Sequence, residues 1–182
     1  MSKELAAYQE RLFASAKEGA TNRRVLLVLQ AMDCGGKDGT VRNVTQSMSP
    51  AGMKAVSFGL PDEEERRHDG LTMVKVMLHI SKDEQKKRLL ARLDDASKHW
   101  KYNPGDLAER ARWDDYQQAY EDAVNRCSTT AAPWYVVPAD RKWYRNWAVA
   151  TLLRDAFADI DPQYPEPDFD VAAERAELLA AD

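Results

Sequence analysis

The sequence has 182 residues, of which 44% are hydrophobic and 31% are charged. This length and composition are typical of one globular domain with a sizeable core, so we expect residues 1–182 to form a single domain. No stretch approaches the roughly 20 apolar residues of a membrane-spanning helix, which argues against a membrane protein. The two cysteines, Cys34 and Cys127, have neither zinc-ligand spacing nor a disulfide pattern, and we expect a cytoplasmic protein.

The formal net charge of −4 is distributed unevenly along the chain. Residues 155–182 contain nine acidic side chains and one arginine, so residues 1–154 carry a net charge of +4. A basic body would attract an anionic substrate. Ordinary surface charge with a solvated acidic tail explains the same count equally well. We expect neither nucleic acid nor a membrane as a partner.

Apolar and polar segments alternate in a way that predicts an α/β fold with a mostly parallel sheet. In chain order we expect a helix over 2–17, a strand over 25–30, a helix over 41–48, strands over 53–60 and 71–80, helices over 81–93 and 106–127, a strand over 134–138 and a helix over 141–159. Residues 160–182 are acidic and rich in proline, which predicts an extended C-terminal strap ending in a short helix.

The stretch VLLVLQAMDCGGKDGT, residues 25–40, joins a buried strand to a helix through a glycine-rich loop. Such a loop turns backbone N–H groups inward, and the helix N-terminus adds positive potential, so the pattern predicts a phosphate cradle. We expect Gly35, Gly36, Lys37, Asp38, Gly39 and Thr40 to bind phosphate, with Lys37 as a catalytic cation. The match to the P-loop pattern is imperfect, since Ala31 replaces its first glycine and Asp38 its metal-binding hydroxyl. The alternative is a glycine-rich turn that binds nothing.

Asp33 places a carboxylate inside this loop. A carboxylate should repel a phosphate unless a divalent cation lies between them, so Asp33 indicates Mg²⁺ as a cofactor and is a candidate metal ligand. A polar interaction that activates an acceptor phosphate is the alternative role. Its neighbour Cys34 is either a redox-sensitive thiol with a lowered pKa or a residue chosen for its small size.

The connection between the second and third expected strands, residues 61–70, is unusually short and highly charged. Parallel neighbours need a crossover of about a dozen or more residues, usually with a helix. Because these ten residues have no apolar face for a helix, a segment expected in this position is missing.

Four stretches together resemble the polyphosphate kinase 2 family of P-loop kinases. They are VLLVLQAMDCGGKDGT, LDDASKHWKYNPGD, RARWDDYQQAYEDA and APWYVVPADRKWYRNWAV, and they run in family order over nearly the whole chain. The resemblance implies a P-loop kinase-like three-layer αβα sandwich. It also implies a Mg²⁺-dependent transfer of phosphoryl groups between inorganic polyphosphate and a nucleotide, with ADP and ATP or AMP and ADP as the nucleotide pair, in a homo-oligomer.

The resemblance also implies that this chain lacks an internal segment of the family. Family members carry several tens of further residues between the positions of Asp69 and Gly70, including the strand that ends in the Walker B motif. In related nucleotide kinases that strand lies beside the P-loop strand, so one central strand is expected to be absent here.

A cluster of basic residues lies where this superfamily has its lid, and we expect residues 94–112 to form a lid-like region. The candidate phosphate clamp consists of Arg88, Arg92, Lys98, Lys101 and Arg112, with Arg110 beside them. The alternative is a solvated pair of helices in which these side chains form ion pairs with Asp94, Asp95, Asp114 and Asp115.

Three functions remain open at this point. The first is a polyphosphate:nucleotide phosphotransferase. The second is a shortened, catalytically impaired relative that binds phosphate chains or joins oligomers as a subunit. The third is an ATP-dependent kinase of a small molecule.

Overall fold

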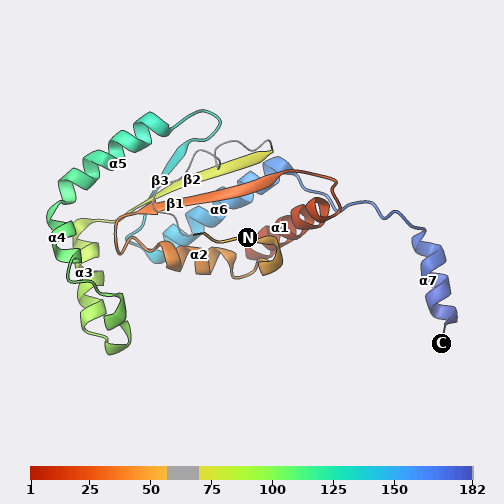
Figure 1. The fold of residues 1–182 in the computed structure, drawn as a ribbon, viewed down its shortest axis with the longest axis horizontal. Coiled ribbons are helices and arrows are strands. Elements are labelled where there is room, and N and C mark those ends of the chain that lie inside the picture. The colour runs from red at the N-terminus through yellow and green to blue at the C-terminus, as the bar shows by residue number, and fades with distance from the viewer. Residues whose placement is uncertain (57–69, 182) are drawn as a thin grey trace.

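A computed structural model describes residues 1–56 and 70–181 of the chain. Three parallel strands form one sheet in the order β1 (Arg24–Ala31), β2 (Leu71–His79) and β3 (Trp134–Pro138) (Figure 1). The prediction of an α/β fold with a parallel sheet is therefore confirmed.

One face of the sheet carries the main core. Val74, Val76 and Leu78 of β2 are buried on this face, where α6 (Lys142–Ile160) crosses the sheet. Two further helices, α1 (Ser2–Lys17) and α2 (Lys37–Thr45), pack against α6. Helices α6 and α2 therefore pack against each other and both contact β1.

The opposite face meets α5 (Trp113–Cys127). Lys75, which alternates with the core residues of β2, donates from Nζ to the Cys127 carbonyl at 2.6 Å. Near the other end of α5, Gln117 donates from Nε2 to the sulfur of Met32 at 3.3 Å. With helices on both faces of the sheet, the three-layer αβα arrangement is confirmed.

The strand predicted over 53–60 differs from the structure in its described part. A 3₁₀ turn, η1 (Pro50–Gly52), is followed by residues 53–56 without regular secondary structure, and residues 57–60 lie outside the described part of the chain. Among the described residues, β1 pairs with β2 and has no strand on its other edge. Val25 to Leu29 are all only half-buried, although such a continuous apolar run is typical of a strand covered on both faces.

Helix α3 (Lys82–Leu93) leads into the lid-like region, residues 94–112, which contains a 3₁₀ segment η3 (Ala96–Lys101) and α4 (Asp106–Ala111). Ser81 is the N-cap of α3, because its Oγ accepts from the Glu84 N–H at 3.1 Å, while its own N–H donates to the Asp140 carboxylate at 2.8 Å. The single helix predicted over 106–127 is wrong. Arg112, with φ −90° and ψ 26°, departs from helical geometry and separates α4 from α5.

The acidic C-terminal residues leave the body of the protein. Ser15 of α1 donates from its hydroxyl to the Gln163 carbonyl at 2.5 Å and holds the start of the strap. The chain then runs outward to α7 (Val171–Ala180), which stands apart from the other helices (Figure 1). Asp170 caps α7 by accepting from the N–H groups of Ala172 and Ala173. Within the described residues, no helix combines the length and apolar character needed to cross a membrane.

Candidate functional site

The loop between β1 and α2 is built around a tight turn and a glycine with a left-handed backbone. The Gly35 N–H donates to the Met32 carbonyl at 3.0 Å, and the intervening Cys34 has φ +61°. Gly36 then caps α2 with φ +98°, a conformation in which glycine pays no Cβ penalty. The loop therefore delivers the chain to the N-terminus of α2 immediately beyond the carboxyl end of β1.

Arg145 of α6 lies directly over this loop. A Cβ added at Gly36 would overlap the Arg145 Nη1, and one added at Gly39 would lie 3.3 Å from its Nη2. The two glycines thus leave the space that the guanidinium occupies. Arg145 is only 3% exposed, so its charge is held inside the protein at the positive end of a helix.

The electrostatic environment of Arg145 is unusual for a buried cation. Its Nε and Nη2 donate to the Asn146 side-chain oxygen at 3.0 and 2.8 Å, and no carboxylate of the described residues forms an ion pair with it. Burial, followed by the charge of nearby Arg88, lowers the pKa of Arg145 from its usual value. An anion bound here would offset that desolvation.

The sequence analysis did not single out Arg145, although a signal was present. Along α6 the buried positions include Arg145, Val149, Leu153 and Phe157, which recur every four residues. An arginine that continues an apolar stripe is placed in the core by the helix itself. This pattern distinguishes Arg145 from the exposed Arg141 and Lys142 just before it.

The predicted phosphate-binding residues occupy different positions around the loop. Lys37 is the first residue of α2, and its Nζ donates to the Ala31 carbonyl at 3.2 Å across the mouth of the loop. Asp38 and Gly39 complete the first turn of α2. The N–H groups of a first turn have no acceptor within the helix. Thr40 is fully buried, and both its N–H and its hydroxyl donate to the Gly36 carbonyl at 3.0 Å. It therefore offers neither donor to a ligand in this conformation, and the Gly35 N–H is likewise held within the turn.

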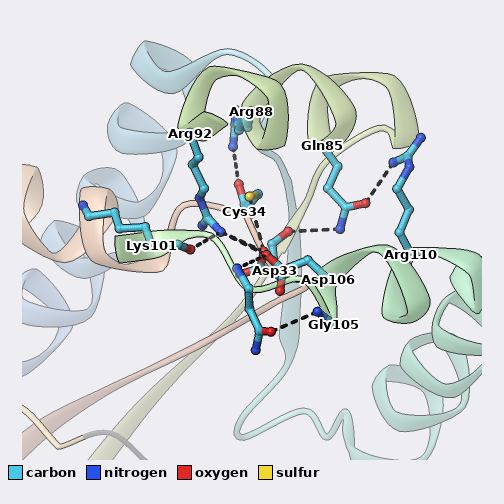
Figure 2. A network of polar contacts seen from close by, with 10 residues as sticks. Asp33, Cys34, Gln85, Arg88, Arg92, Lys101, Gly105, Asp106 and Arg110 are labelled. Atoms are coloured by element: carbon cyan, nitrogen blue, oxygen red, sulfur yellow. Dashed lines mark hydrogen bonds and ion pairs between the residues drawn. The ribbon is translucent and has the colours of Figure 1, made fainter. Parts of the chain in front are cut away.

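Asp33 is exposed beside the loop and paired with the lid-like region. Its Oδ2 accepts from the Arg92 Nη1 at 3.1 Å, and the same Nη1 lies 3.5 Å from the Asp106 carboxylate and donates to the Lys101 carbonyl at 2.9 Å (Figure 2). One arginine therefore joins the loop to η3 and α4.

A protein-built metal cage is absent from the described residues, which contain no group of three potential metal ligands among His, Cys, Asp and Glu. Asp33 supplies one exposed carboxylate beside the loop, while the Asp106 carboxylate is paired with Arg92. A single carboxylate fits a Mg²⁺ ion that takes most of its ligands from substrate phosphates and water.

Cys34 does not have the lowered pKa that a redox role would require. Burial, reinforced by the Asp33 carboxylate, raises the pKa of the thiol to about 12. Because the thiolate is the reactive form, this environment protects the sulfur from oxidation and supports the structural interpretation of Cys34.

The structure divides the predicted clamp into two groups. Arg88 and Arg92 reach the loop, where Arg88 donates to the Cys34 carbonyl at 2.8 Å and to the Ala139 carbonyl at 2.7 Å. The side chains of Lys98 and Arg112 instead form local ion pairs, with Asp95 at 2.5 Å and with Asp115 at 3.5 Å. The Lys101 ammonium lies over the exposed Trp100 ring. The alternative to a phosphate clamp, in which basic side chains form solvated ion pairs, therefore describes Lys98 and Arg112.

Replacing Gly36 by alanine tests the contact between the loop and Arg145. The added methyl group would displace the guanidinium, and the positive φ would add about 1–2 kcal/mol of strain. We expect affinity for inorganic tripolyphosphate, measured by calorimetry, to fall about tenfold or more. Gly19→Ala is the matched control, because Gly19 has φ +73° and no atom within 4 Å of an added Cβ. An equal loss in both variants would show that only backbone strain matters.

Comparisons with known proteins agree with one another. The sequence profile of the family described as polyphosphate kinase 2 matches residues 1–71 and 67–165. An AMP/ADP-polyphosphate phosphotransferase of Meiothermus ruber is 36% identical, over 92% of this chain and 82% of the relative. An ADP-polyphosphate phosphotransferase of Rhodopseudomonas palustris is 30% identical, over 96% and 82%. The crystal structure of polyphosphate kinase 2 from Arthrobacter aurescens TC1 matches with a TM-score of 0.90 and 43% identity, over 98% of this chain and 83% of that one.

Proposed function

This chain belongs to the polyphosphate kinase 2 family, and from that premise we propose that it transfers phosphoryl groups between inorganic polyphosphate and a nucleoside mono- or diphosphate. The observation that carries the proposal is Arg145, a buried guanidinium without a carboxylate partner among the described residues, placed over a glycine loop at a helix N-terminus. The relatives are AMP/ADP- and ADP-polyphosphate phosphotransferases, and from them we take the substrate class, with AMP or ADP as acceptor.

The geometry supports binding by charge neutralisation. The first-turn N–H groups of α2 and the Arg145 guanidinium approach the loop from two helices, and together they would hold the oxygens of one phosphate. Lys37 lies at the mouth of the loop, where its ammonium can leave the Ala31 carbonyl and bridge to the next phosphate of a chain. Phosphoryl transfer needs little covalent chemistry from the protein, so fixed donors of this kind carry most of the catalysis.

We propose Asp33 as the protein ligand of Mg²⁺, which when bound would neutralise phosphate charge and orient the oxygens of the substrate. Because the Asp33 Oδ2 accepts from Arg92, binding of a cation at Asp33 would release Arg92 toward the phosphates. Arg92 is therefore placed to bind either the Asp33 carboxylate or, when a cation occupies Asp33, the phosphates of the substrate.

The proposal includes a cytoplasmic homo-oligomer. Cys34 and Cys127 are both free thiols, which fits a reducing compartment. The half-buried apolar side chains of Val25 to Leu29 favour association, because a second subunit would cover them.

A second candidate is a phosphate-binding subunit with impaired turnover. The alignment with the Meiothermus ruber relative spans 225 residues, whereas 92% of this chain is about 167 residues. The difference of about 58 positions, together with the family match that breaks near residues 67–71, supports the absence of an internal segment. If that segment holds the Walker B aspartate, Asp33 lacks its partner carboxylate at the metal.

One assay separates these candidates. Purified chain is incubated with polyphosphate, Mg²⁺ and either AMP or ADP, and the nucleotide product is quantified. Product formation supports the phosphotransferase, whereas binding of polyphosphate without turnover supports the impaired subunit. Phosphorylation that requires ATP and a small molecule, but no polyphosphate, would contradict both and favour an ordinary kinase.

Salt dependence tests the phosphate-binding surface separately from catalysis. Polyphosphate is a dense polyanion, so each contact with it should release counterions, as in nucleic-acid binding. With about three phosphate contacts, affinity should fall about 20- to 40-fold between roughly 50 and 200 mM salt. The measurement is calorimetric titration with polyphosphate at several salt concentrations. An affinity that does not change with salt would argue against a polyphosphate groove.

A further inference from the structure

Three side chains of α3 form hydrogen bonds with Asp33 and Cys34, the two residues that precede Gly35 in the loop. Gln85, Arg88 and Arg92 lie on one face of α3, at spacings of three and four residues. Gln85 donates from Nε2 to the Asp33 carbonyl at 3.2 Å, and Arg88 donates to the Cys34 carbonyl at 2.8 Å. Arg92 binds the Asp33 carboxylate (Figure 2).

These contacts fix an otherwise unfavourable backbone conformation. Cys34 has φ +61°, which costs a residue with a Cβ about 1–2 kcal/mol, and it is held through the carbonyl groups on both sides of it. The C=O and N–H groups of a trans peptide point in opposite directions. By drawing the Asp33 carbonyl toward α3, Gln85 therefore turns the N–H of that peptide, which belongs to Cys34, away from α3.

Gln85 also contacts the lid-like region. It is 3% exposed, and its Oε1 accepts from the Arg110 Nη1 of α4 at 2.9 Å (Figure 2). The same Nη1 donates to the Lys82 carbonyl at 2.6 Å. Both ends of one buried amide are thus engaged, one by the phosphate loop and one by α4. A shift of α4 is therefore transmitted to the loop through Gln85, in addition to the link through Arg92.

We propose that Gln85 is a positioning residue that sets the conformation of the phosphate loop and couples it to α4. The inference rests on the proposed function, because it assumes that the loop binds phosphate. Gln85 touches neither the phosphate nor the reacting atoms in this arrangement; it acts through the Asp33 carbonyl.

The test is Gln85→Met, which keeps the length and volume of the side chain and removes both hydrogen bonds. We expect affinity for inorganic tripolyphosphate to fall about tenfold, because the Asp33 carbonyl loses the donor that orients it. In the turnover assay with polyphosphate and ADP, KM should rise while kcat changes much less. Arg110→Met removes the contact of Gln85 to α4, together with the Arg110–Lys82 bond, and leaves the bond of Gln85 to Asp33 in place. It should reproduce part of the loss.

Gln9→Met is the matched control. Gln9 is 5% exposed and its amide also bonds to backbone, donating to the Ser49 carbonyl at 3.3 Å and accepting from the Ser49 N–H at 3.0 Å, but it lies on α1. It should lower thermal stability to a similar degree and leave tripolyphosphate affinity unchanged. The inference is overturned if Gln85→Met binds tripolyphosphate as tightly as the parent chain, or if Gln9→Met loses as much affinity. If the parent chain itself does not bind tripolyphosphate, the proposed function fails instead.

Discussion

Replacing Lys37 by alanine is expected to lower polyphosphate-dependent turnover about a hundredfold or more, as the loss of one transition-state donor typically does. The ammonium lies at the mouth of the loop, where it can follow the charge that develops between donor and transferred phosphate. The fold should survive, because Lys37 is exposed and, among the described residues, its side chain makes one hydrogen bond, to the Ala31 carbonyl at 3.2 Å. The measurement is nucleotide formation under saturating polyphosphate, alongside thermal unfolding.

Lys3→Ala is the matched control for this change. Lys3 is an exposed lysine near the start of α1, and its removal changes the net charge by the same amount. It should leave turnover unchanged, so any effect of overall charge would appear in both variants. A Lys37→Ala chain with undiminished turnover would remove the loop from the mechanism and leave Arg145 as a purely structural cation.

The glycine-rich turn between strand β1 and helix α2 could be predicted from sequence because its physics is local. A short apolar strand, a glycine at a left-handed position and a lysine at the first turn of a helix follow one another within a few residues. Gly36 and Lys37 are the N-cap and first residue of α2 (Lys37–Thr45), so this helix begins and ends earlier than the helix predicted over 41–48. Thr40 is the exception, since the helical turn that follows carries its side chain into the core.

Arg145 could not be assigned in the same way. It lies more than a hundred residues from Gly36 in sequence, and only the packing of α6 on α2 brings the two together. In the lid-like region, too, the sequence alone could not show which basic side chains reach the loop. Lys98 and Arg112 are as basic as Arg92, yet each finds a carboxylate three residues away, whereas Arg92 reaches Asp33 across the site. Composition identifies the charges, but tertiary contacts decide which of them face the loop.

The edge of β1 shows a conflict between sequence and structure. Five consecutive apolar residues, Val25 to Leu29, are typical of a central parallel strand buried on both faces, and an uncovered strand edge is prone to association. In the described residues they are only half-buried, and β1 is paired on one edge alone. Such a strand is suited to a neighbour that the described residues do not supply, and the alignment with the relative is about 58 positions longer than the aligned part of this chain.

Inserting that segment should therefore raise turnover. We predict that a chain carrying the corresponding residues of the Meiothermus ruber relative between Asp69 and Gly70 turns over about a hundredfold faster than the present chain. The insert would cover the edge of β1 and supply a second carboxylate to the metal beside Asp33, and one preorganised electrostatic group is worth about that factor. Nucleotide formation from polyphosphate measures the first effect, and light scattering measures association.

The control is a glycine-serine insert of equal length at the same position, which relaxes the connection without adding a strand or a carboxylate. It should leave turnover low and the oligomer unchanged. Because the present chain exposes half-buried apolar residues along β1, we expect it to associate whether or not it turns over substrate. A monomeric parent chain with robust polyphosphate-dependent phosphorylation of AMP or ADP would refute both parts of the prediction. It would mean that Asp33, Lys37 and Arg145 suffice for catalysis without a second metal carboxylate.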